Sequence, residues 1–176
     1  MERLRVVAWG LLVVVLDLDV DQLDLIPDPI GWAMVLLAVW DLRRLHPAFS
    51  AGAAAAAVGL VVSVPAWVGA QGWPISVASG LAEVVVLFST CTALVALVPE
   101  KSEVADRLRW FAVGLVLFLG PVLLLVPDPF ASEALVVPVT VMVVVAAVGL
   151  VIVFVWFLVL LFQCARYPDP QMPEES

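Results

Sequence analysis

Apolar runs alternate with short polar segments along the whole chain, and six of these runs are long enough to form membrane helices. A helix rises 1.5 Å per residue, so it needs roughly 17 to 25 residues to cross the ~30 Å hydrocarbon core of a bilayer. The pattern therefore predicts an all-α integral membrane bundle of six transmembrane helices, arranged as three hairpins in one domain over residues 1–176. The predicted spans are about 6–26, 29–45, 50–70, 75–98, 109–126 and 134–163.

The composition supports a membrane protein. Hydrophobic residues make up 64% of the 176 residues and charged residues only 14%, against roughly 45–50% and about 25% in soluble domains. The mean hydropathy is +1.15. Six spans leave no room for a separate soluble domain, so the lipid bilayer is the predicted environment of the whole chain.

The basic residues predict the orientation of the bundle. All eight lie before the first span, after the second, between the fourth and fifth, or after the sixth; they are Arg3, Arg5, Arg43, Arg44, Lys101, Arg107, Arg109 and Arg166. Because Lys and Arg are enriched in cytoplasmic loops, both termini are predicted to be cytoplasmic. The Asp-rich segment and the 70–74 and 127–133 connections are then outside.

Tryptophans fit these boundaries, since their amphipathic rings favour the headgroup level. Trp156 is the exception and is predicted to pack between helices. The others lie near predicted inner boundaries at Trp9, Trp40 and Trp110, and near outer ones at Trp32, Trp67 and Trp73.

An acidic segment follows the first apolar run and interrupts the first predicted span. Its carboxylates are Asp17, Asp19, Asp21, Asp24 and Asp28. The apolar run before them, 6–16, would make only ~16 Å of helix, so the span has to include aspartates. Two alternatives follow: the helix continues to Ile26, or it unwinds near Asp19, where acidic and apolar residues alternate. Asp28 followed by Pro29 is a helix start signal.

Glu83 is the other acidic residue predicted to lie inside the membrane. It lies ~12 Å from the outer end of the fourth span, at the level predicted for Asp17. We therefore predict a polar layer that binds a cation or proton. Its predicted carboxylates are Asp17, Asp19, Asp21, Asp24 and Glu83, and its supporting hydroxyls are Ser63, Ser79 and Thr140. The alternative is a water-exposed acidic rim, with Glu83 bonded to a hydroxyl or Trp as a packing device.

Other chemistry is sparse, so we predict no enzyme activity, no cofactor and no metal site. His46 is predicted to serve a loop, and Cys91 and Cys164 to be buried structural thiols. The spacing of the aspartates matches part of an EF-hand, but Gln22 stands where that loop requires glycine. The basic residues are too scattered for nucleic acid.

The segment Asp24-Leu-Ile-Pro-Asp-Pro-Ile-Gly-Trp32 resembles a motif of uncharacterised small multi-pass membrane proteins of Gram-positive bacteria, especially actinobacteria. The resemblance covers the first hairpin only. It implies a location in the bacterial cytoplasmic membrane and no particular activity.

Two functions of different class agree with these features. In the first, the protein binds or conducts a cation or proton through the carboxylate layer. In the second, it is a non-catalytic accessory or scaffold subunit, and its partners are other membrane-protein subunits. A water-accessible path to Glu83 would favour the first function, and a sealed, hydrogen-bonded Glu83 the second.

Overall fold

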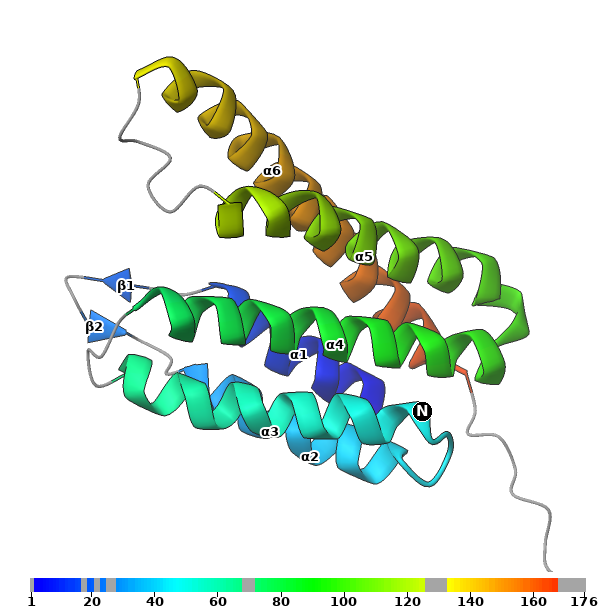
Figure 1. Ribbon diagram of the computed structural model, residues 1–176. Coiled ribbons are helices and arrows are strands. Elements are labelled where there is room, and N and C mark those ends of the chain that lie inside the picture. Colours follow the sequence, from blue (N-terminus) through cyan, green and yellow to red (C-terminus); the bar gives the residue numbers. More distant parts are fainter. Residues whose placement is uncertain are drawn as a thin grey trace, which may run out of the picture.

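The computed structural model describes residues 2–16, 19–20, 23–24, 28–67, 72–125 and 133–167. Figure 1 shows a bundle of helices that run alternately in opposite directions. The elements are α1 Arg3–Leu16, β1 Asp19–Val20, β2 Leu23–Asp24, α2 Asp28–Leu42, α3 Ala48–Trp67, α4 Trp73–Leu97, the 3-10 turn η1 Pro99–Lys101, α5 Ser102–Leu125 and α6 Glu133–Cys164. The predicted all-α class is confirmed, with six α-helices among the described residues.

Each helix packs against the next one in the chain, and α6 returns to pack against α1. One end of the bundle holds the N-terminus, the α2–α3 turn, the α4–α5 turn and the end of α6. We call it the basic end because it carries the arginines and Lys101. The β1–β2 pair lies at the opposite end, and α2 runs from that side toward the basic end (Figure 1). This order follows the predicted hairpins.

Among the residues that the structure describes, three helices are long and apolar enough to cross a membrane: Ala48–Pro65 in α3, Pro74–Leu97 in α4 and Thr140–Cys164 in α6. Their exposed surfaces are also apolar, as Val61 in α3 and Val151 in α6 show. Exposing such an apolar surface to water is unfavourable, whereas exposing it to hydrocarbon is not. The structure therefore supports a membrane protein with transmembrane helices.

The first helix is shorter than predicted, because α1 ends at Leu16 and does not continue to Ile26. The strands β1 and β2 pair antiparallel instead, with Asp19 opposite Asp24 and Val20 opposite Leu23. Asp is a poor helix former, and alternation of acidic and apolar residues suits an extended backbone. The predicted 6–26 helix is thus wrong, and unwinding near Asp19 is the better interpretation.

The other helix boundaries agree more closely. The α2 helix begins at Asp28, as the Asp-Pro start signal predicts, and ends at Leu42. The α5 helix begins at Ser102 and not at 109, because its polar first turns are helical as well. The backbone amide of Ala48 donates to Nδ1 of His46 at 3.1 Å, so His46 supports the turn before α3.

Glycines allow neighbouring helices to pack closely at two places in the bundle. Gly10 of α1 and Gly31 of α2 face one another, and a Cβ added to either would come within 2.8 Å of the other's carbonyl oxygen. Gly59 of α3 lies directly against the indole ring of Trp32. Small residues that let helices approach closely are typical of membrane bundles.

Two predictions about tryptophan are wrong for a related reason. Trp32 was predicted at the outer boundary, but it is 0% exposed and packs against Gly59 between α2 and α3. Trp156 was predicted between helices, but it is 63% exposed on α6. Hydrophobicity does not distinguish these positions. The glycine that makes room for the indole is on another helix.

Candidate functional site

The acidic segment is only partly described. Asp17 and Asp21 lie outside the described residues, and Asp19 and Asp24 are described only as backbone positions in β1 and β2. The proposed neighbourhood of Asp17 and Glu83 therefore stays a prediction.

Glu83 lies near the middle of α4, half-buried at a pocket of about 160 Å³ between α1, α4, α5 and α6. In the part of the chain that the structure describes, its carboxyl has no hydrogen-bond or ion-pair partner. The other residues of the pocket are all apolar: Leu11, Val15, Val84, Leu87, Ala112, Leu150, Val151, Val153, Phe154 and Phe157. An ionised carboxylate in such surroundings is costly unless a proton or cation neutralises it.

Asp28, the first residue of α2, interacts electrostatically with Glu83. The lengths of the helices explain why. Asp28 lies fourteen positions before Leu42 at the end of α2, and Glu83 lies fourteen positions before Leu97 at the end of α4. Both carboxyls therefore lie about 21 Å above the basic end.

Asp28 was not among the predicted site residues, because its Asp-Pro sequence was interpreted only as a helix start. The length of α2 is the feature that identifies Asp28 as a site residue. The α2 helix has 15 residues, or about 22 Å, which is less than the ~30 Å hydrocarbon core. A helix that starts so close to the basic end places its first residue at the depth of Glu83.

The predicted hydroxyls do not line the Glu83 pocket. Ser63 is buried in α3, and its hydroxyl donates to the carbonyl of Leu60 at 2.9 Å. Thr140 is exposed on α6, and Ser79 is half-buried one turn before Glu83. Among the described residues, no hydroxyl or Trp forms a hydrogen bond with Glu83. The alternative in which Glu83 serves packing through such a bond therefore has no support in this part of the chain.

Charged side chains at the basic end form their own contacts. Arg3 pairs with Asp41 at 3.0 Å and joins α1 to α2. Arg109 pairs with Asp106 and donates to the Thr92 hydroxyl at 3.3 Å. These contacts hold neighbouring helices together at this end, away from Glu83.

Tyr167 connects the end of α6 to the α4–α5 turn. Its hydroxyl donates to the carboxylate of Glu100. This hydrogen bond raises the pKa of Tyr167, because it holds the phenolic proton, and the nearby negative charge acts in the same direction.

Cys91 and Cys164 are free and buried, as predicted. Among the described residues no three His, Cys, Asp or Glu side chains form a group that could hold a metal ion. Comparisons with protein-family models, curated proteins and solved structures find no match for this chain.

Proposed function

We propose that this protein crosses the bacterial cytoplasmic membrane six times and that it binds and releases a proton at the Glu83 and Asp28 carboxyls. The observation that carries the proposal is a half-buried carboxyl in an otherwise apolar pocket, with a second carboxyl at the same height. Two carboxyls that repel each other in such a place are not both ionised cheaply, so protonation of one of them is the simplest way to reduce the cost.

The segregation of charge supports the membrane orientation. All eight basic residues belong to segments at the basic end, whereas Asp28 begins its helix toward the opposite end. The positive-inside rule then puts the basic end in the cytoplasm. Because α1 and α2 are only 14 and 15 residues long, the first hairpin has less helix than a span requires. Water from the outer face then has the shortest path to the carboxyls over this hairpin.

A proton fits the described site better than a metal cation does. Hard cations such as Ca²⁺ take six to eight oxygen ligands, and Mg²⁺ takes six. The pocket supplies only the Glu83 carboxyl, and the rest of its lining is hydrocarbon. A proton needs only one oxygen.

Infrared difference spectroscopy of the protein in lipid, recorded while the pH is varied, tests this proposal. We expect a protonated carboxyl band in the parent that is lost in Glu83→Gln and shifted in Asp28→Asn. Glu2→Gln is the matched control, because it removes an exposed carboxylate at the basic end. Identical titrations in the parent and Glu83→Gln would refute proton binding at this pocket.

A flux assay in proteoliposomes then separates conduction from binding alone. A trapped pH dye reports proton entry under an imposed potential in the parent, Glu83→Gln and Glu2→Gln. Entry that is lost only in Glu83→Gln supports conduction through the pocket.

The second candidate is an accessory subunit, and the exposure of α6 favours it. Only 28% of the span Thr140–Cys164 is buried within the chain, which leaves a long helix face for another membrane protein. This function predicts no protonation band that depends on Glu83, so the infrared experiment distinguishes the two.

A further inference from the structure

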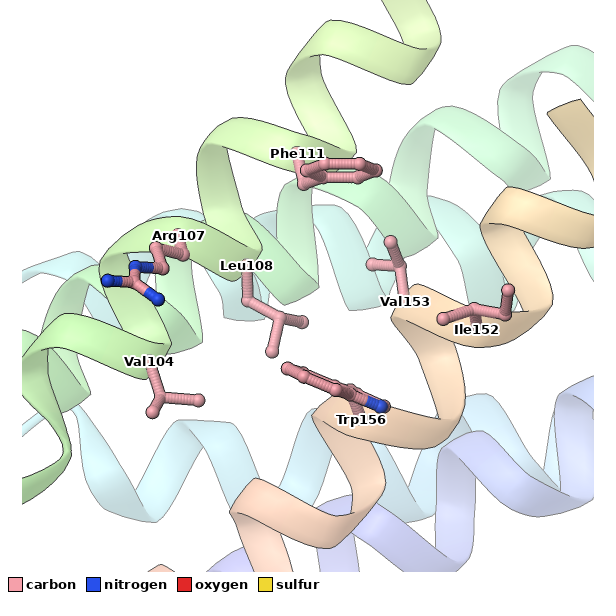
Figure 2. Close-up of a pocket in the computed structure, with 7 residues that line it drawn as sticks. All are labelled: Val104, Arg107, Leu108, Phe111, Ile152, Val153 and Trp156. Atoms are coloured by element: carbon pink, nitrogen blue, oxygen red, sulfur yellow. The ribbon is translucent and has the colours of Figure 1, made fainter.

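Two apolar grooves lie side by side on the outer surface of α5, near the basic end. The first, which we call the α5–α6 groove, has a volume of about 320 Å³. Figure 2 shows its lining residues: Val104, Arg107, Leu108, Phe111, Ile152, Val153 and Trp156. The second, the α5 groove, has a volume of about 620 Å³ and is lined by Asp106, Arg107, Trp110, Phe111, Gly114 and Leu115.

Arg107 and Phe111 line both grooves. They are four residues apart on one helix, so they lie one above the other on the same face. Together they form a ridge with an apolar groove on each side and a guanidinium toward the basic end. Trp110 lies eight residues from the start of α5 and Trp156 eight from the end of α6, so each groove has an indole about 12 Å from that end.

We propose that this surface binds one anionic phospholipid from the leaflet at the basic end. Arg107 holds the phosphate, and one acyl chain lies in each groove on either side of Phe111. The shape matches a molecule with one charged head and two apolar chains. Guanidinium groups bind phosphate through paired hydrogen bonds, and indoles favour the headgroup boundary.

The ion pair that Arg107 already makes is weak enough to give way to an anionic headgroup. Arg107 pairs with Glu103, but the two side chains are 77% and 78% exposed, and such pairs contribute only about 0–1 kcal/mol. Phosphate can therefore displace the glutamate. Asp106, the one acidic residue lining the α5 groove, is already paired with Arg109.

The surface faces hydrocarbon in any orientation that puts α5 and α6 in a bilayer. The inference needs that location but does not depend on Glu83, so either proposal can fail without the other.

Native mass spectrometry of the detergent-solubilised protein with equal amounts of phosphatidylglycerol and phosphatidylcholine tests the inference. We expect the parent to retain phosphatidylglycerol preferentially. Arg107→Gln should weaken the binding of phosphatidylglycerol about tenfold, as the loss of one charge-assisted phosphate contact implies. It should also reduce the preference, because the positive charge of Arg107 attracts the net negative phosphatidylglycerol more than the zwitterionic phosphatidylcholine. Arg5→Gln is the matched control, because it removes an exposed arginine at the same end that lines neither groove.

A second pair of variants tests the acyl chain. Cβ atoms added at Gly114 and at Gly80 both meet open space, so a side chain can leave the backbone at either position without a clash at its Cβ. Gly114→Trp fills the α5 groove and should reduce the binding of both lipids, whereas Gly80→Trp on α4 should not.

Three results would overturn the proposal. They are an unchanged preference in Arg107→Gln, an equal loss in Arg5→Gln, and a lipid-free dimer whose second copy covers the grooves.

Discussion

The contact between Gly59 and Trp32 predicts that Gly59→Ala destabilises the bundle. A methyl group at Gly59 would lie 2.5–2.6 Å from three ring atoms of Trp32, closer than carbon atoms can approach. The indole is 0% exposed, so it cannot move aside without disturbing its neighbours. Overpacking of this kind costs about 1–3 kcal/mol, and a contact with a rigid ring belongs at the upper end of that range. Alanine's better helix propensity offsets about 1 kcal/mol, which leaves a net loss of about 2 kcal/mol.

Reversible unfolding of the micelle-bound protein by sodium dodecyl sulfate, followed by near-ultraviolet circular dichroism, measures this loss. Gly114→Ala is the control with the opposite sign, because its methyl group meets open space and only the gain in helix propensity remains. Trp32→Phe in the Gly59→Ala background should recover part of the loss, since residues in contact are not additive. A Gly59→Ala protein as stable as the parent would refute the packing argument.

Three further predictions concern the charged end and the thiols. Glu100→Gln should move the titration of Tyr167, the only tyrosine in the chain, to lower pH in absorbance measurements. The pKa of Tyr167 is raised in the folded protein. Its contact with Glu100 therefore stabilises the fold below the ordinary tyrosine pKa of about 10, and this stabilisation is lost as the pH rises through the folded pKa. An unchanged titration in Glu100→Gln would contradict the hydrogen bond. Cys91 and Cys164 are both 0% exposed, so maleimide should label neither until the protein unfolds, and labelling of the folded protein would contradict their burial. Asp41→Asn should change the free energy of unfolding by less than about 1 kcal/mol in the detergent assay, because its ion pair is exposed; a larger loss would show that the pair is shielded from water.

The short first hairpin shapes the candidate site. If α1 and α2 were as long as α4, Asp28 would begin its helix well above the level of Glu83. The short helices instead place Val15 in the lining of the Glu83 pocket and Asp28 near enough to interact electrostatically with Glu83.

Part of the candidate site could be predicted from the sequence. Glu83 was identified because a carboxylate inside a long apolar run is costly and therefore informative. Asp28 was missed, since its role depends on where its helix starts relative to another helix. Ser63 lies 15 positions from the start of α3, a height close to that of Glu83, but height alone does not determine which side of a helix faces the pocket.

The sequence by itself determined the helical class, the order of the helices and the separation of basic from acidic segments. Hydrophobic run length and charge placement are local properties, and they act on each helix separately. Only the tertiary structure decided that Trp32 is buried and Trp156 exposed, that Glu83 faces an apolar pocket, and that Asp28 lies at its level. Each of these depends on which helices lie side by side and where each one ends, so no single segment of the chain contains the information.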